Sequence, residues 1–245
     1  MKAKSVGLIG YGSFGELLVE LLHGRVKTKV YSRTSGKVPR HLRASIEEVA
    51  VCDYVVLAIP LAVYQAVLAE LAKLIAPTTV VIDVCSVKVV PCELISELLP
   101  HNRLVATHPL FGPQTAAAGL KNLTMVICDE ESDAAQALLV DAFCKTLGLK
   151  VVHMSADEHD RQMAKVHALT FFVAEALNGL DLESVTLKTP SFAKLTDLAS
   201  LTEVESRALL DTLQTGNPYA AGVRREFVRK VEEQELGLQR PTDES

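Results

Sequence analysis

The sequence predicts an α/β fold, with a doubly wound parallel sheet in the first part of the chain and helices alone in the second. Short runs rich in β-branched residues alternate with longer helical stretches up to residue 153, which is the pattern of strands joined by crossover helices. Several of these runs are apolar throughout, as expected when helices cover both faces of a sheet. No strand pattern follows, so we divide the chain into domains at 1–153 and 154–245.

Each element of the first domain follows from its local sequence. Strands are expected at 5–9, 29–32, 54–59, 79–83, 104–107, 124–128 and 150–153. Helices are expected at 13–23, 61–74, 89–98 and 133–147. Gly24 and Gly148 follow two of these helices, at the position where a left-handed residue commonly ends a helix.

A long helix at 155–180 dominates the second domain. Ser155 can cap its first turn, and Glu158 three residues later completes a capping box. One apolar face is formed by Met163, Val166, Leu169, Val173 and Leu177. A helix this apolar needs partners on more than one side, so we expect an all-helical domain that also builds a homodimer interface. The charged stretch 224–239 should form the last helix, before a frayed tail at 240–245.

Composition excludes two kinds of partner. The formal net charge of −5 argues against a nucleic-acid surface, because phosphate binding needs clustered Lys and Arg. The longest apolar run, 54–64, is short and contains Pro60, so no membrane span is expected. Hydrophobic residues make up 49% of the chain, which favours a buried sheet together with a subunit interface.

The compartment and the metal content are also predicted. The first strand begins at Ser5, which leaves no room for a signal or transit peptide, so we expect a cytoplasmic protein. The five cysteines form no Cys-x-x-Cys pair and are expected to be reduced and mostly buried. Helix capping and surface exposure explain His153, Asp157 and His159 adequately, so no metal site is expected.

A glycine motif, Gly10-x-Gly12-x-x-Gly15, lies between the first expected strand and the first helix. In this context it is typical of a Rossmann-type dinucleotide site. Gly10 permits the tight turn, Gly12 lets the backbone approach a pyrophosphate, and Gly15 allows close packing of helix and strand. The amides of Ser13 and Phe14 then face the phosphates at the start of the helix.

The end of the second strand favours NADP over NAD. An NAD site normally carries an acidic residue there, which bonds the ribose 2′-hydroxyl. No acidic residue occurs between Glu20 and Glu47, and the strand ends in Ser32-Arg33-Thr34. A guanidinium with neighbouring hydroxyl groups suits a 2′-phosphate, because arginine binds phosphate with two hydrogen bonds.

Two polar side chains follow neighbouring strands at the edge where open α/β sheets bind their ligands. Ser86 comes after the strand that ends at Asp83, and His108 after the strand that ends at Thr107. A neutral imidazole there can accept the proton of a substrate hydroxyl as hydride leaves the same carbon. Ser86 can hydrogen-bond that hydroxyl or the imidazole, or cap the next helix. We expect Lys88 on the solvated surface of that helix.

Four segments occur in a characteristic order: Gly10-Tyr11-Gly12-Ser13-Phe14-Gly15, Asp83-Val84-Cys85-Ser86-Val87-Lys88, Thr107-His108-Pro109-Leu110-Phe111-Gly112-Pro113 and Glu158-His159-Asp160. The set resembles the prephenate/arogenate dehydrogenase family of tyrosine biosynthesis, especially its short NADP-using arogenate branch. The resemblance implies oxidation of the ring hydroxyl of a small-molecule substrate, prephenate or arogenate, with hydride transfer to NADP. Decarboxylation then gives 4-hydroxyphenylpyruvate or tyrosine.

The resemblance also implies roles for single residues. His108 matches the family's catalytic histidine, and Ile59 and Pro60 fall where the family packs along the cofactor. Gln114 and His167 fall at substrate-proximal positions. The family's partner for the substrate carboxylate is left open among Arg161, Lys194, Arg207, Arg224 and Arg225.

The pair His159-Asp160 also matches the family, but it is explained equally well as organising the start of the long helix.

Two other functions stay open at this point. Another reductase of the 6-phosphogluconate dehydrogenase-like group would place a catalytic lysine in the long helix, where Lys165 lies, and would have no use for His108. A non-catalytic NADP-binding regulator would keep the fold, and the unassigned substrate arginine favours it. Substrate-dependent NADPH production separates these functions. Prephenate and arogenate differ only at a keto or amino group, so the sequence does not choose between them.

Overall fold

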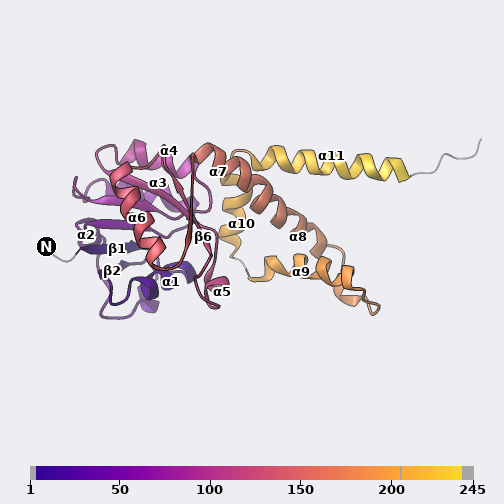
Figure 1. Ribbon diagram of the computed structural model, residues 1–245, viewed down its shortest axis with the longest axis horizontal. Coiled ribbons are helices and arrows are strands. Elements are labelled where there is room, and N and C mark those ends of the chain that lie inside the picture. Colours follow the sequence, from indigo (N-terminus) through magenta and orange to yellow (C-terminus); the bar gives the residue numbers. More distant parts are fainter. Residues whose placement is uncertain (1–3, 205, 239–245) are drawn as a thin grey trace, which may run out of the picture. The chain divides into compact units, whose positions relative to one another are not determined.

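The computed structural model describes residues 4–204 and 206–238 (Figure 1), so the expected tail at 240–245 lies outside the described residues. The chain forms two compact units, Met1–His159 and Asp160–Ser245. Their division falls inside helix α7 (Ala156–Met163), a little later than the boundary placed at 153 from the sequence.

The first unit is built on a seven-stranded sheet in the order β2-β1-β3-β4-β5-β6-β7. Its strands are β1 (Ser5–Ile9), β2 (Lys27–Tyr31), β3 (Tyr54–Leu57), β4 (Val80–Asp83), β5 (Arg103–Pro109), β6 (Thr124–Cys128) and β7 (Lys150–Met154). Every run expected to be a strand is one, with ends displaced by at most two residues. The predicted α/β architecture is therefore confirmed.

The sheet is mixed rather than purely parallel. β5 and β6 are antiparallel, with His108 opposite Val126, whereas every other neighbouring pair is parallel. The connection between them holds only the short helix α5 (Pro113–Ala116), and parallel neighbours usually need a full crossover helix. The chain direction therefore reverses just after His108, which leaves this residue at the edge of the sheet where β1, β3 and β4 end.

Helices cover both faces of the sheet (Figure 1). They are α1 (Ser13–Leu22), α2 (Ile46–Ala50), α3 (Tyr64–Leu71), α4 (Val89–Leu98) and α6 (Ala134–Thr146), with short 3₁₀ turns η1 (Ser35–Lys37) and η2 (Leu61–Val63). Side chains of a strand alternate between the faces. Val55 and Leu57 thus pack with α2, α3 and α4, while Val56 and Val105 pack on the side of α1 and α6.

The sheet surface between α1 and α6 borders a cavity of about 380 Å³. Side chains of β3 and β4 border this cavity together with side chains of α1 and α6. The lining is apolar and includes Phe14, Leu18, Val56, Ile82, Phe111 and Phe143.

The second unit is helical over its described residues. After α7 come a π turn η3 (Ala164–Leu169), α8 (Thr170–Asn178), the 3₁₀ turn η4 (Leu182–Ser184), α9 (Pro190–Val204), α10 (Arg207–Asp211), a π turn η5 (Thr212–Gly216) and α11 (Ala220–Leu238). The Ser155 hydroxyl accepts the N–H of Glu158 at 3.1 Å, so the predicted cap is confirmed. None of the described helices combines the length and the apolar character that crossing a membrane requires.

The predicted long helix at 155–180 is interrupted by the π turn η3, where the regular backbone bonds are shifted. Gln214 donates to the carbonyl of Ala168 inside this turn at 2.8 Å. The partner of this contact lies 46 positions away in the sequence, so the helical periodicity alone does not predict the contact.

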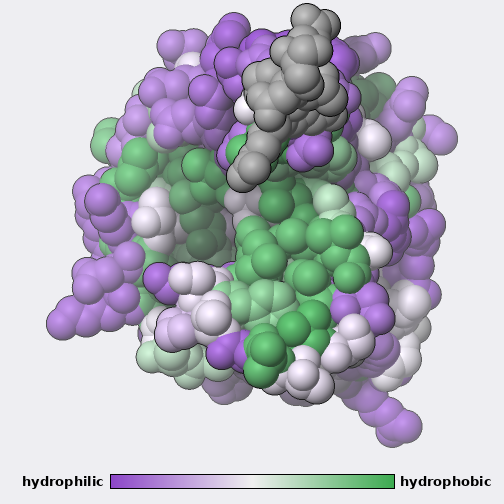
Figure 2. Space-filling view, turned by 90° about the vertical axis from the view of Figure 1, so that its right-hand side faces the viewer, coloured by the Kyte–Doolittle hydropathy of each residue, from purple (hydrophilic) through white to green (hydrophobic). Residues whose placement is uncertain are grey.

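The apolar face of the interrupted helix is only partly covered. Ala168 and Phe171 are buried with Leu213 and Ala220 in the core of this unit. Val166, in contrast, is 64% exposed, together with exposed apolar side chains at Leu180, Leu187 and Leu195. Figure 2 shows a continuous hydrophobic area on the viewed face of the molecule.

Candidate active site

The glycine loop after β1 leaves one position open. Gly10 has φ +106°, and a Cβ there would lie 2.1 Å from the carbonyl oxygen of Ala58. A Cβ on Gly15 would lie 2.4 Å from the carbonyl oxygen of Gly10. A Cβ on Gly12 would meet nothing described within 4 Å. The fold itself therefore requires Gly10 and Gly15, whereas Gly12 borders open space that suits a closely approaching ligand.

Helix α1 presents its first amides at the same loop. Gly12 is the N-cap, and the first helical bond runs from Glu16 N–H to the Gly12 carbonyl at 2.9 Å. The N–H groups of Ser13 and Phe14 precede that bond and have no place in the helical pattern. They can therefore hold an anion such as a pyrophosphate.

The loop after β2 presents Arg33 close to the glycine loop. Gly10 N–H donates to the carbonyl of Tyr31 at 2.9 Å, two residues before the exposed Arg33. The hydroxyls of Ser32 and Thr34 lie 3.2 Å apart. Arg43 donates to the carbonyl of Val38 at 2.6 Å, which braces this loop.

The segment after β3 completes this end of the sheet. The N–H of Ala58 donates to the carbonyl of Ile9 at 2.9 Å, so the segment runs beside the glycine loop. Ile59 is half-buried against the core, and the exposed Pro60 caps the turn η2. Both predicted cofactor contacts therefore lie beside the loop that carries Gly10.

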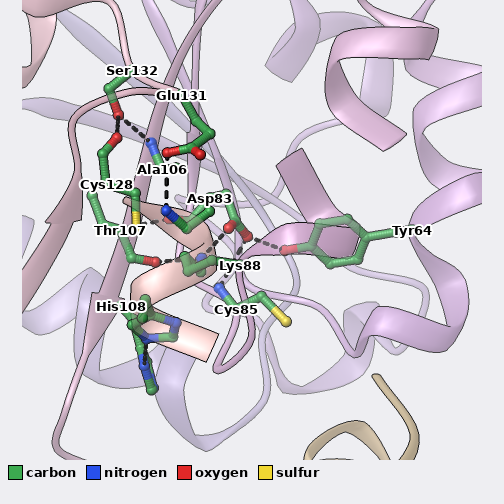
Figure 3. Close-up of polar contacts among 12 residues, drawn as sticks. Tyr64, Asp83, Cys85, Lys88, Ala106, Thr107, His108, Cys128, Glu131 and Ser132 are labelled. Carbon is green, nitrogen blue, oxygen red and sulfur yellow. Dashed lines mark hydrogen bonds and ion pairs between the residues drawn. The ribbon is translucent and has the colours of Figure 1, made fainter. Parts of the chain in front are cut away.

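A buried ionic network joins the ends of β4 and β5. The carboxylate of Asp83 receives hydrogen bonds from the Tyr64 hydroxyl at 2.5 Å and the Cys85 N–H at 3.0 Å, and forms an ion pair with Lys88. Lys88 also donates to the carbonyl of Thr107 at 2.6 Å, and the Thr107 hydroxyl donates to the Asp83 carbonyl at 2.7 Å. Figure 3 shows Asp83 between Tyr64 and Lys88, with Thr107 and His108 on the adjoining strand.

The network keeps its charges inside the protein. The side chains of Asp83 and Lys88 are both fully buried. Burial alone would lower the pKa of Lys88, but attraction to the Asp83 carboxylate outweighs it and leaves that pKa above the ordinary lysine value. Burial, reinforced by Asp83, raises the pKa of Tyr64 well above its usual value. At neutral pH Lys88 is therefore a cation, while Tyr64 stays protonated and donates to Asp83.

The structure corrects two expectations for this loop. Lys88 does not lie on a solvated helix surface, because it is fully buried. Ser86 does not cap the next helix, since α4 begins at Val89 with Lys88 as its N-cap. The Ser86 hydroxyl is instead buried without a hydrogen-bond partner among the described residues. It lies three residues beyond Asp83 and suits a ligand hydroxyl.

His108 is held by a second histidine. Its Nδ1 lies 2.8 Å from Nε2 of His159, and the ring centroids are 5.0 Å apart at an interplanar angle of 76°. Both side chains are buried, with exposed fractions of 4% and 1%. Asp160 is buried as well, so the contact with His108 adds to any role of this pair at the helix start. Sequence reasoning missed the contact because 51 residues separate its partners.

The two predicted substrate contacts lie in different units. Gln114 is exposed on α5 in the first unit, a few residues after His108. His167 belongs to the second unit, where its ring lies 5.2 Å from that of Phe171. Their parts in substrate binding stay predictions.

The cysteines near this site are buried thiols. Burial raises the pKa of Cys85 to about 12, which keeps this thiol protonated at neutral pH. All five cysteines are buried, as predicted. Within the described residues, no group of three or more His, Cys, Asp or Glu side chains is placed to hold a metal ion.

Comparisons with known proteins agree with the resemblance. Residues 32–153 match the prephenate dehydrogenase nucleotide-binding domain. The chain is 26% identical over 231 residues to arogenate dehydrogenase 1, chloroplastic, of Arabidopsis thaliana, covering 88% of this chain and 36% of that protein. It is 24% identical over 197 residues to a probable arogenate/prephenate dehydrogenase of Methanocaldococcus jannaschii, covering 77% and 44%. The chain thus spans less than half the length of these two curated relatives.

A solved structure shares the fold. Prephenate dehydrogenase from A. aeolicus, in complex with hydroxyphenyl propionate and NAD+, matches with a TM-score of 0.77 at 19% identity. The match covers 98% of this chain and 92% of that chain. The same arrangement of sheet and helices therefore persists where little sequence identity remains.

The buried ion pair gives a stability prediction. Lys88→Met leaves the Asp83 carboxylate buried without its cation, so we expect the free energy of unfolding to fall by about 3–5 kcal/mol in urea denaturation. The double variant Asp83→Asn/Lys88→Met removes both charges and should recover about half of that loss. As a control, Lys145→Met breaks a pair whose lysine is 62% exposed and should cost about 1 kcal/mol or less. Equal losses for Lys88→Met and Lys145→Met would contradict this role of the pair.

Proposed function

The chain belongs to the prephenate/arogenate dehydrogenase family, and on this premise we propose that it oxidises prephenate or arogenate with NADP as hydride acceptor. The observation that carries the proposal is His108, buried at the end of β5 beside the loop of Ser86, with one ring nitrogen held by His159. A base in that place is what the oxidation of a ring hydroxyl requires.

The chain offers a fitting site for a dinucleotide. The open space at Gly12 and the amides of Ser13 and Phe14 suit the pyrophosphate, and Ile59 and Pro60 would lie along the cofactor. Arg33, with the hydroxyls of Ser32 and Thr34, would hold the 2′-phosphate. When bound, the nicotinamide supplies the acceptor for one hydride.

The residues of the site handle the proton. His108 accepts the hydroxyl proton through Nε2 as hydride leaves the same ring carbon, which becomes a carbonyl carbon. The bond to the ring carboxylate then breaks, CO₂ leaves, and the electron pair of that bond enters the ring. The ring becomes aromatic and its oxygen takes a proton back as a phenol. Ser86 would donate a hydrogen bond to the reacting oxygen and hold it against His108.

Substrate contacts are proposed at Gln114 and His167. Two of the five basic residues left open for the substrate carboxylate already have hydrogen-bonded partners in the second unit. Arg207 binds Glu175 at 2.8 Å and Asp211 at 3.1 Å. Arg224 donates to the side chain and the carbonyl of Gln214, both at 2.8 Å. A carboxylate would have to displace these contacts, which argues against Arg207 and Arg224.

We also propose a cytoplasmic location, which the set of buried thiols supports because such thiols suit a reducing compartment. The Arabidopsis relative is named as chloroplastic, so the location of this chain is to be measured by fractionation.

The function and its base are tested together. Purified protein should produce NADPH when given prephenate or arogenate, and His108→Ala should lower kcat about 10²–10⁴-fold. NADP affinity should change little, because the glycine loop and Arg33 carry that binding. Activity should also fall on acidification, since an imidazolium cannot accept the hydroxyl proton. Turnover of His108→Ala near the parent rate would remove His108 from the mechanism, and no NADPH with either substrate would favour a non-catalytic protein or another hydroxy acid.

Arg33 gives a prediction for the cofactor. We expect kcat/KM for NADP to exceed that for NAD at least about tenfold, equivalent to about 1.4 kcal/mol. Arg33→Asp should shrink or reverse this preference, because a carboxylate repels the 2′-phosphate and can bond the ribose hydroxyls of NAD. Arg25→Asp, an exposed change outside the loop, serves as the control. Equal use of both cofactors by the unmodified chain would contradict the assignment.

The exposed apolar face of the second unit gives a prediction for assembly. We propose a two-fold dimer that covers this face, so the chain should sediment as a dimer at micromolar concentration. Val166→Glu should favour the monomer, because it places a charge in the covered interface. Leu138→Glu, at an equally exposed leucine of α6 in the first unit (67% against 64%), should leave the dimer intact. A monomeric parent protein would contradict the proposal.

A further inference from the structure

His108 and His159 share one hydrogen bond between two ring nitrogens, and a bond of this kind holds a single proton. Nδ1 of His108 and Nε2 of His159 are 2.8 Å apart, which is a hydrogen-bond distance. One of the two nitrogens must carry the proton, and the other must accept it with its lone pair.

The direction of this bond decides whether His108 can act as a base. A neutral imidazole carries one proton on its two nitrogens. If Nδ1 of His108 donates, its Nε2 has a lone pair and can accept the substrate proton. If His159 donates instead, Nε2 of His108 carries the proton and cannot accept another while the ring is neutral.

We propose that His159 is a positioning residue that fixes His108 in the tautomer with the proton on Nδ1, and so makes Nε2 the base. The inference rests on the proposed function for its consequence in catalysis, but the tautomer itself is a property of the resting protein. His159 plays the part that a carboxylate or a backbone carbonyl plays behind other catalytic histidines. Because it is neutral when it accepts, it orients His108 without adding a negative charge behind it.

Both rings are attached to firmly held backbone. On the side of His108, the neighbouring Thr107 carbonyl accepts from Lys88 at 2.6 Å, and the Thr107 hydroxyl bonds the Asp83 carbonyl. These contacts hold β5 against the loop after β4. The backbone that carries the His108 ring therefore has a fixed position.

The side of His159 is held as firmly. The N–H of His159 donates to the carbonyl of Ser155 at 3.0 Å, and the Ser155 hydroxyl caps the helix. The N–H of Ala156 donates to the carboxylate of Glu131 at 3.1 Å. The first turn of α7 is thus tied to the loop before α6, which fixes the position from which His159 reaches His108.

The charged groups near the histidine pair are Lys88, Asp83, Glu131 and Asp160. Lys88 and Asp83 next to β5 compensate each other, and burial keeps the thiol of Cys85 protonated. Glu131 faces the start of α7, and Asp160 follows His159 directly. None of these groups is altered in the variants below, so a change in pH dependence reports on position 159.

The tautomer is measured directly by ¹⁵N nuclear magnetic resonance of histidine-labelled protein, because ring nitrogens with and without a proton have well separated chemical shifts. At pH values above the acidic limb of the activity profile, Nδ1 of His108 in the parent protein should carry the proton and Nε2 should not. In His159→Leu, His108 should populate both tautomers. His101→Leu, which removes an exposed histidine elsewhere, should leave the His108 signals unchanged. A parent protein with the proton on Nε2 of His108 would overturn the proposal.

Kinetics give the second measurement. His159→Leu should lower kcat about 10–100-fold, as is typical when the partner of a functional histidine is lost, with little change in KM. His159→Gln can accept from Nδ1 through its amide oxygen and should recover much of the rate and the parent tautomer. His159→Glu should also restore the tautomer, and its negative charge should move the acidic limb of the profile to higher pH by about one unit or more.

The outcomes separate this inference from the proposed function. A merely structural role for His159 predicts that Gln and Glu fail as Leu does, with no change in the His108 tautomer and no displaced pH limb. If the His159→Glu variant does not fold, the His159→Leu and His159→Gln variants still distinguish a positioning role of His159 from a merely structural one. A parent protein that shows the expected tautomer but makes no NADPH would overturn the function while the inference about His159 stands. An active protein whose His108 tautomer stays the same in every variant at position 159 would overturn the inference alone.

Discussion

The ion pair between Asp83 and Lys88 is the interaction on which the arrangement of the site depends. Two charges without solvent contact are costly unless each is fully satisfied. Here the carboxylate is shared by an ammonium, a phenol and a backbone N–H, and the ammonium reaches on to the Thr107 carbonyl. The pair therefore holds the ends of β4 and β5 together, and Ser86 and His108 lie at these strand ends.

The topology explains why the ends of β4 and β5 need this connection. Parallel strands give a common edge where ligands bind, but β5 is followed by a reversal of chain direction into β6. No long crossover helix follows His108 to hold the end of its strand. The contacts from Lys88 and Thr107 to the neighbouring strand supply that support from inside the sheet, and His159 supplies it from helix α7.

The site also retains features that do not favour stability. A buried hydroxyl at Ser86 lacks a partner among the described residues, and two imidazoles share a bond in a buried setting. Groups of this kind are expected where a ligand completes the hydrogen bonding and where the geometry must exist before the ligand arrives. The apolar packing on both faces of the sheet around these groups offsets the stability that they cost.

The sequence by itself determined the strands, the glycine loop and the expected cofactor class, because these signals are local. Gly10 needs its positive φ whatever the rest of the chain does, and the absence of an acid near Arg33 can be read without coordinates. The environments of Lys88, His159 and the π turn were decided only by tertiary structure. From its local sequence, Lys88 is expected to be solvated at the start of a helix, but the carbonyl of Thr107, 19 residues away, binds it inside the protein. His159 is likewise expected only to begin a helix, but β5 places His108 beside it. Burial and pairing are relations between distant segments, so a local pattern does not contain them.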